Sequence, residues 1–145
     1  MPARPGKGES VFFETFAPTE PPRDGDELLA RWERLIDIRR LVNKALENAK
    51  GEIGKSLEAA VAVAADAETC SFLAGFGDQL KDVFIVSAVE VREDPAATAG
   101  PVVTVARAPG AKCSRCWCWS TGVGESATHP EVCPRCAGAL AVIAP

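Results

Sequence analysis

Apolar side chains recur at every third or fourth position between residues 24 and 50, which is the period of one face of an α-helix. Asp24 and Glu27 are spaced to form a variant of the capping box at its start, and Gly51 is a suitable residue to end it. We therefore expect one long amphipathic helix with its apolar stripe against a core. The stripe comprises Leu28, Trp32, Leu35, Ile38, Val42, Ala45 and Ala49, and is widened by Leu29, Ile36, Leu41 and Leu46.

Shorter apolar runs further along the chain predict a small sheet. The strand-like runs are 57–65, 83–91 and 102–108. The alanines of the first run would also suit a helix, and its short length favours a strand. Residues 69–81 predict one short helix with three inward side chains, Leu73, Phe76 and Leu80. The expected fold class is α+β, with the long helix packed against a β-α-β-β layer.

The first 23 residues contain five of the eleven prolines and predict an extended arm. An apolar run at 11–13, followed by Phe16, is expected to anchor this arm, for example as an edge strand. The expected domains are the arm over 1–23, the helix with its α/β layer over 24–108, and a third module over 109–145.

The chain has 145 residues, of which 47% are apolar, enough for one core and a small additional module. No stretch approaches the roughly 20 apolar residues of a membrane span, and the N-terminal residues lack the apolar segment of a secretory signal. We therefore expect a cytoplasmic protein without a membrane partner. Thiols stay reduced in that compartment, which favours metal binding over disulfides.

Five of the six cysteines lie within residues 112–136, where Cys113 and Cys116 form one C-x-x-C pair and Cys133 and Cys136 form another. Each two-residue gap allows a tight turn to direct both sulfurs at one point, and two such turns make a tetrahedral cage for zinc. Four thiolates leave no open position for a substrate. We therefore expect one structural Zn²⁺ that stabilises a zinc-ribbon or finger module too small for a large core of its own.

Three further side chains bear on this site. Cys118 could exchange into the cage, but a C-x-C pair suits one metal less well, so we interpret it as a bystander thiol. His129 is the only histidine and could replace a cysteine ligand, but we interpret it as an exposed loop residue. Cys70 is interpreted as a small buried apolar residue.

The formal net charge of −4 is unevenly distributed. Residues 1–106 carry 12 basic and 18 acidic side chains, whereas residues 107–145 carry 4 basic and 2 acidic ones. A divalent metal with four thiolates would add about −2 and cancel this local excess. The distribution therefore excludes a broad basic footprint and leaves only local contacts with nucleic acid.

Basic and aromatic side chains surround the two cysteine pairs. Such side chains on rigid turns suit RNA loops, because cations bind phosphates and rings stack on unpaired bases. We expect one tryptophan to pack on the small core and leave the other open. The candidate RNA-binding residues are Lys112, Arg115, Trp117, Trp119 and Arg135.

Motifs for catalysis are missing from the sequence. It contains no phosphate-binding Gly-Lys loop, no cluster of metal-binding carboxylates, and one histidine to serve as a base. We therefore expect no catalysis by this chain alone.

Three blocks of the sequence resemble the C-terminal region of bacterial isoleucyl-tRNA synthetases in their order, their spacing and their residues. The blocks are LLARWERLIDIRRLVNKALENAKGEIGKSLEAAVAV, then LKDVFIVSAVEV, then KCSRCWCW with the later CPRC. The first residues, MPARPGKGESVFFETFAP, are similar to the segment that leads into this region. The resemblance thus covers essentially the whole chain.

The resemblance implies a part of a class I enzyme that activates isoleucine with ATP and attaches it to its tRNA. Neither ATP-handling signature of that family, of the His-Ile-Gly-His or the Lys-Met-Ser-Lys-Ser type, occurs here. We therefore expect an excised module that binds the anticodon arm of the isoleucine tRNA, while a catalytic domain outside this chain performs aminoacylation. By position, the four C-x-x-C cysteines fall on the family's zinc ligands, whereas Cys118 departs from its pattern.

Other interpretations remain open. The chain could be a free-standing paralogue, or an independent zinc ribbon that binds RNA or protein. Formamidopyrimidine DNA glycosylases have a similar finger, but their nucleophilic proline precedes glutamate, whereas Pro2 precedes Ala3 here. Their finger also carries a basic tip, and no Lys or Arg lies between Cys116 and Cys133. We therefore do not expect DNA as a partner.

Overall fold

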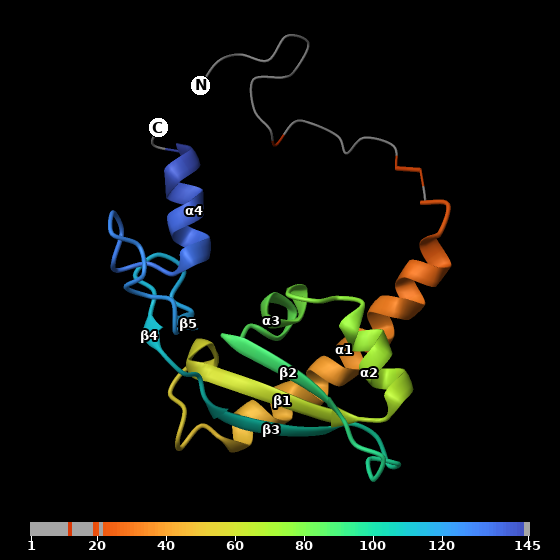
Figure 1. Ribbon diagram of the computed structural model, residues 1–145. Helices are drawn as coiled ribbons and strands as arrows, with labels where there is room; N and C mark the ends of the chain where they lie inside the picture. The colour runs from red at the N-terminus through yellow and green to blue at the C-terminus, as the bar shows by residue number, and fades with distance from the viewer. Residues whose placement is uncertain (1–11, 13–18, 21, 144–145) are drawn as a thin grey trace.

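The computed structural model describes residues 12, 19–20 and 22–143, so most of the expected arm and its anchoring run lie outside the described residues. The described chain forms a long helix, a three-stranded sheet with two short helices, and a C-terminal lobe (residues 109–143) (Figure 1). The elements are α1 (Gly25–Asn48), the 3-10 turn η2 (Ser56–Glu58), β1 (Ala59–Ala65), α2 (Ala67–Ala74), α3 (Gln79–Phe84), β2 (Ala88–Glu93), β3 (Val102–Arg107), β4 (Ala111–Lys112), β5 (Trp119–Ser120) and α4 (Pro134–Ile143).

The three-stranded sheet has the order β2-β1-β3, with β1 parallel to β2 and antiparallel to β3. Alternate residues of the central strand β1, from Ala59 to Ala65, are buried, and those between them are half-buried. The buried residues pack with apolar side chains of α1, α2 and α3 in one core. The expected α+β class is confirmed, with one long helix against a small layer of strands and helices.

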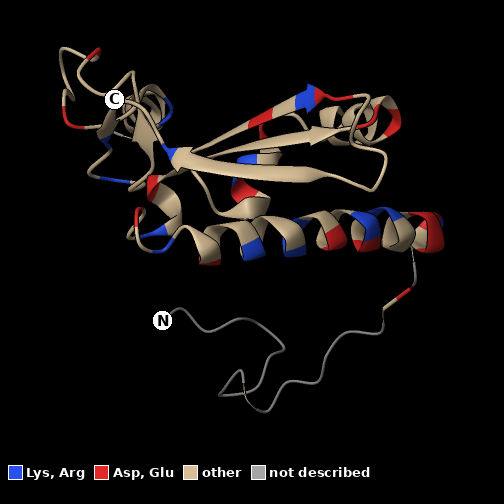
Figure 2. Ribbon diagram, turned by 90° about the horizontal axis from the view of Figure 1, so that it is seen from below, with Lys and Arg blue, Asp and Glu red and all other residues tan. Residues whose placement is uncertain are grey.

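Helix α1 runs along one face of the sheet and contacts β3 and α3 (Figure 2). Its residues Leu35, Ile38 and Val42 are buried in the core. Leu28 and Trp32 were expected to face the same core but are 42% and 40% exposed; Trp32 still contacts this core, because its ring lies 6.4 Å from that of Phe76. The first turns of α1 project beyond the edge of the sheet (Figure 1), which leaves these two side chains partly in solvent.

Both ends of α1 differ from the prediction. The Asp24 side chain makes no capping hydrogen bond, and its ψ of 25° departs from the extended conformation of a capping residue. The predicted capping box is therefore wrong. The helix ends at Asn48, and the Ala49 N–H donates to the Ala45 carbonyl at 3.1 Å, so the chain leaves the helix before Gly51.

The single helix predicted over 69–81 is also wrong, because two short helices, α2 and α3, occupy this region. Asp66 begins α2 by accepting a hydrogen bond from the Thr69 N–H at 2.8 Å. Gly77 separates the helices with a φ of +49°, a left-handed conformation that glycine adopts readily. The three side chains expected to face the core do so: Leu73, Phe76 and Leu80.

The run 83–91 was predicted to be a strand from its first residue, but β2 begins only at Ala88. Phe84 belongs to α3, where it lies four residues after Leu80 on the same buried face. Ile85 then takes a left-handed φ of +57° and ends the helix. Burial of the Phe84 ring thus outweighs the β propensity of its neighbours.

The C-terminal lobe has a small core of its own, formed by Cys113, Val132, Cys133 and Cys136. At its entry, Gly110 has a φ of +91°, and an added Cβ would collide with the backbone of Ser120 and Thr121. Only glycine fits this close approach. Helix α4, which the sequence pattern did not predict, completes the lobe. Among the residues described, the helices are too short or too polar to cross a membrane.

Candidate metal centre

Two tight turns bring the cysteine pairs together. In the first, the Trp117 N–H donates to the Cys113 carbonyl at 3.0 Å, which folds the chain so that Cys113 and Cys116 lie on one side. In the second, Cys133 directly precedes α4, and the Ala137 N–H donates to its carbonyl at 2.9 Å. The Cys133 N–H in turn donates to the Cys113 Sγ at 3.3 Å, so backbone and sulfur are joined across the two turns.

The four sulfurs form one group. Sγ atoms of Cys113, Cys116, Cys133 and Cys136 all lie within 4.8 Å of one another, and those of Cys116 and Cys133 are 3.8 Å apart. Four sulfurs bound at about 2.3 Å to a tetrahedral zinc are themselves separated by about 3.8 Å. The donor set and its spacing therefore fit such an ion with little movement. The prediction that these four cysteines converge on a possible metal site is confirmed.

The pKa values of Cys113, Cys116 and Cys133 are shifted in different directions. Burial raises the pKa of the Cys113 thiol, but hydrogen bonds from the backbone N–H groups of Cys116, Cys133 and Arg115 together lower it more, to about 6. Burial raises the pKa values of Cys116 and Cys133. Without a metal, negative charge is thus placed first on Cys113. A divalent cation would supply the positive charge that lets Cys116 and Cys133 ionise.

Arg115 lies against this group rather than pointing away from it. Its Nη1 donates to the Cys136 Sγ at 3.7 Å, a contact that orients the sulfur. Cys118 lies outside the four-sulfur group, and its Sγ donates to the Cys116 carbonyl at 3.8 Å. His129 is half-buried, rather than the exposed loop residue expected from the sequence.

Trp117 and Lys112 form a small exposed surface beside the cysteines. Trp117 is 61% exposed and has a φ of +66°, an uncommon conformation for a non-glycine residue. The Lys112 Nζ lies 5.7 Å from the centre of the Trp117 ring, close enough for a cation–π contact. The ring and the ammonium group are therefore presented together to solvent.

Trp119, the residue paired with Lys112 in the β4–β5 hairpin, contacts residues of the three-stranded sheet region. It is half-buried, and Arg107 lies over its ring at 5.6 Å. Its backbone N–H donates to the Ser87 Oγ at 2.7 Å, and that hydroxyl donates to the Leu57 carbonyl at 2.5 Å. The two tryptophans thus differ, one open and one half-buried, but Trp119 packs toward Arg107 and Ser87 rather than on the small core as expected.

The sequence of this chain is similar to part of several known proteins. No model of a protein family matches the chain. The isoleucine–tRNA ligase of Geobacter sulfurreducens is 40% identical to it, over 97% of this chain. The proteins of the same name from Desulfotalea psychrophila and Bordetella avium are 44% and 41% identical, over 88% and 90% of it.

This chain is homologous to part of the bacterial isoleucine–tRNA ligases. It spans 16%, 15% and 14% of the length of these three relatives. The four-cysteine group therefore belongs to a ligase-related region, and the activity of the complete relatives is not implied for this part.

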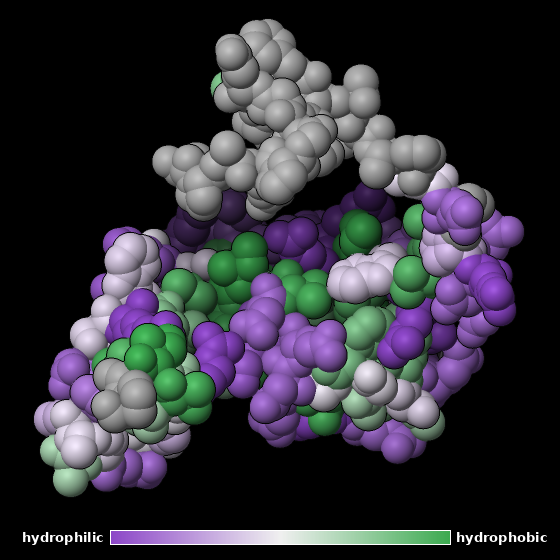
Figure 3. Space-filling model, turned by 90° about the horizontal axis from the view of Figure 1, so that it is seen from above, coloured by the Kyte–Doolittle hydropathy of each residue, from purple (hydrophilic) through white to green (hydrophobic). Residues whose placement is uncertain are grey.

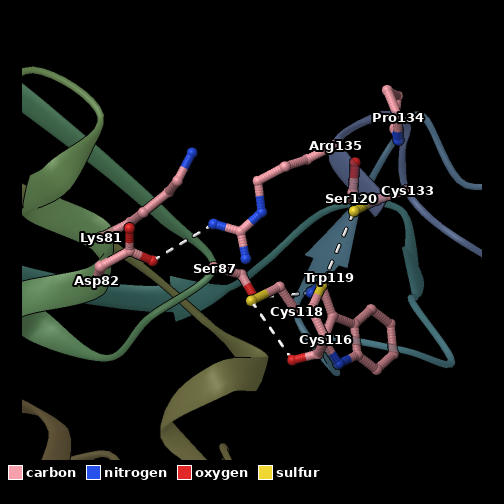
Figure 4. Close-up of a pocket in the computed structure, with 10 residues that line it drawn as sticks. All are labelled: Lys81, Asp82, Ser87, Cys116, Cys118, Trp119, Ser120, Cys133, Pro134 and Arg135. Atoms are coloured by element: carbon pink, nitrogen blue, oxygen red, sulfur yellow. Dashed lines mark hydrogen bonds and ion pairs between the residues drawn. The ribbon is translucent and has the colours of Figure 1, made fainter. Parts of the chain in front are cut away.

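The last candidate residue of the ligase-related chain, Arg135, faces a pocket between α3 and the C-terminal lobe (Figure 4). Its Nη1 lies 3.7 Å from the Asp82 Oδ1, and this charge raises the pKa of Arg135. The pocket has a volume of about 150 Å³. It is lined by Lys81, Asp82, Ser87, Cys116, Cys118, Trp119, Ser120, Cys133, Pro134 and Arg135.

Sequence reasoning missed Lys81, Asp82 and Ser87, which line this pocket from the sheet side. The nearest signal was the charged pair at 81–82, which lies where the predicted helix 69–81 meets the predicted strand 83–91. Only the fold places these residues opposite Arg135. Of the five predicted RNA-binding residues, Lys112 and Trp117 consequently lie on the open surface, Trp119 and Arg135 line this pocket, and Arg115 contacts Cys136.

Proposed function

We propose that this chain is a tRNA-binding C-terminal module of an isoleucine–tRNA ligase, which holds the anticodon arm while a catalytic domain outside this chain acts on the tRNA. The observation that supports this most strongly is the exposed Trp117 with Lys112 on a four-cysteine turn, in a chain 40% identical to such a ligase. A ring and a cation on a rigid turn suit an unpaired RNA base and its phosphate.

The metal in this proposal is a structural Zn²⁺ held by Cys113, Cys116, Cys133 and Cys136. When bound, it would supply a fixed tetrahedral cross-link and no reacting position. The lobe has a small core in which three of the four buried residues are cysteines. A metal bound to them would therefore supply much of its folding free energy.

Three cations near the lobe give the expected strength of binding. Lys112, Arg115 and Arg135 would each neutralise at most one phosphate, and each phosphate lowers the slope of log K against log salt by about 0.7 for single-stranded RNA. The combined slope is then about −2, so we expect modest and salt-sensitive affinity. Arg115 also contacts Cys136, so its removal would disturb the metal centre as well as RNA.

The test therefore uses Lys112. Binding of the isoleucine tRNA and of an unrelated tRNA is measured by gel shift at several salt concentrations. We expect preference for the isoleucine tRNA, and we expect Lys112→Gln to weaken binding and to reduce the salt slope by about one phosphate contact. Lys44→Gln, which removes an exposed lysine on α1, should change neither quantity.

Equal binding of both tRNAs, or binding of neither, would contradict the proposal. It would favour a second function, a protein-interaction module, which one observation supports. Val142 and Ile143 are exposed at the end of α4 and form an apolar patch there (Figure 3). Specific protein interfaces have such apolar centres, although a stable one buries about 1,200 Å² or more in total.

A further inference from the structure

A pocket separate from the open surface of Trp117 and Lys112 lies between α3 and the C-terminal lobe. We propose that it binds one unpaired guanine base of RNA, an inference that rests on the proposed tRNA-binding function. Its volume of about 150 Å³ is well below the roughly 300 Å³ or more that encloses a drug-sized ligand. A single planar base is a ligand of suitable size, whereas a whole nucleotide is too large.

The charged groups of the pocket match the edge of guanine. Asp82 and Lys81 approach from α3, and Arg135 approaches from α4 on the other side (Figure 4). The Watson–Crick edge of guanine has one acceptor, O6, beside two donors, the N1–H and the 2-amino group. A carboxylate can accept from both donors at once, while a guanidinium or ammonium group donates to O6. Asp82 with Arg135 or Lys81 supplies both kinds of partner.

These charged groups are available to a ligand. The Arg135 Nη1 and the Asp82 Oδ1 are 3.7 Å apart, longer than the 2.7–2.9 Å typical of a charge-assisted hydrogen bond. Their side chains are 59% and 63% exposed, and an ion pair of this kind contributes little to stability. Replacing this ion pair by hydrogen bonds from both side chains to a base therefore costs little free energy.

The wall of the pocket is more rigid than its charged rim. The Ser87 hydroxyl joins two segments, since it accepts from the Trp119 N–H at 2.7 Å and donates to the Leu57 carbonyl at 2.5 Å. This fixes Trp119, whose residue lines the pocket, relative to the sheet. A neutral base entering the pocket would meet preorganised walls and two adjustable charged sides.

The same lining argues against a phosphate as the ligand. Lys81 and Arg135 would attract it, but Asp82 would repel it. The sulfurs of Cys116 and Cys133, which carry excess negative charge in a four-thiolate metal site, would repel it as well. Guanine is neutral, and its donors are attracted by the carboxylate. The electrostatics therefore favour a base over the backbone that carries it.

The test uses the full chain with its metal bound and three seven-nucleotide RNAs, which place guanosine, inosine or uridine at the centre of six uridines. Inosine lacks only the 2-amino group of guanosine. Binding is measured by fluorescence anisotropy at low salt. We expect guanosine to bind about fivefold or more tightly than inosine, since a bidentate contact to a base discriminates by about that amount or more.

The Asp82→Asn variant should bind guanosine and inosine equally, because an amide accepts with one oxygen only and sets its own NH₂ group against the second donor of guanine. Glu90→Gln, which removes an exposed acidic charge from β2, outside the pocket, should keep the guanosine preference and controls for net charge. Asp82 is exposed, so Asp82→Asn is expected to fold, which circular dichroism and metal content verify.

Equal binding of the three RNAs by the unaltered chain would overturn the inference, and so would a guanosine preference that survives in Asp82→Asn. If the isoleucine tRNA is still preferred over another tRNA in either case, the proposed function stands without this pocket. Failure of the chain to bind any RNA would overturn both.

Discussion

Trp117, beside the metal centre, has a strained backbone conformation and an exposed side chain. Its φ of +66° is the conformation that glycine adopts without cost, and it costs other residues about 1–2 kcal/mol. The ring is 61% exposed, so little burial offsets this cost. A large side chain that is both strained and exposed is better explained by contact with a ligand than by folding.

Two substitutions separate strain from packing at this residue. Trp117→Gly and Trp117→Ala both remove the ring, but only glycine relieves the left-handed conformation. We expect the glycine variant to be more stable than the alanine variant by about 1 kcal/mol, as measured by thermal unfolding of the metal-bound chain. Both variants should bind the isoleucine tRNA more weakly. Lower stability of Trp117→Gly than of Trp117→Ala would contradict the account of strain.

Asp66 gives a prediction for pH. The hydrogen bond from the Thr69 N–H lowers the pKa of Asp66 below its ordinary value of 3.8. A carboxyl whose pKa is lower in the folded state stabilises the fold above pH 3.8, and this contribution is lost as the pH falls through the lowered value. The stability difference between the unaltered chain and Asp66→Asn should therefore be constant near neutral pH and shrink in acid. Urea unfolding of both proteins at a series of pH values measures this difference in stability. A difference that grows in acid would contradict the role of Asp66 as the cap of α2.

At the scale of elements, the sequence predicted what depends on local periodicity and missed what depends on packing partners. The strands β1 and β3 lie close to the predicted runs 57–65 and 102–108, because alternation and β-branching are local signals. The strand predicted over 83–91 began too early, because Phe84 is buried in the core as part of α3. The four-cysteine group was predictable because its ligands come in two local pairs.

Contacts between distant elements could not be predicted in this way. The pairing of Asp82 with Arg135 and the contact of Ser87 with Trp119 join residues far apart in the sequence. Each depends on where the C-terminal lobe lies against the sheet. Their side chains carry no local signal that distinguishes them from ordinary surface residues. The pocket was for this reason absent from the predictions.

Helix α1 provides a matched pair of substitutions that tests which of its faces is buried. Leu35 is fully buried against the sheet, whereas Leu29 is mostly exposed on the projecting turns. Leu35→Ala should lower the free energy of unfolding by about 2–5 kcal/mol through lost burial and a cavity. Leu29→Ala should change it by less than about 0.5 kcal/mol. Similar effects in urea unfolding would contradict the packing of α1.

At the scale of the whole molecule, two separate cores are stabilised by different interactions. The larger core joins α1 to the sheet and contains apolar side chains throughout, whereas the smaller core contains three cysteines and Val132. Stability of the first follows from apolar burial, and stability of the second follows from its sulfurs. The metal centre is therefore expected to control the lobe that carries Trp117 and Lys112, while the sheet remains folded without it.

Backbone hydrogen exchange before and after addition of a zinc chelator tests this account most directly. With the metal bound, amides over residues 111–143 and over β1 should both be protected. After chelation, we expect protection to be lost over residues 111–143 and retained in β1 and its neighbouring strands. Unchanged protection over residues 111–143 would contradict the claim that four cysteines hold a metal on which the lobe depends.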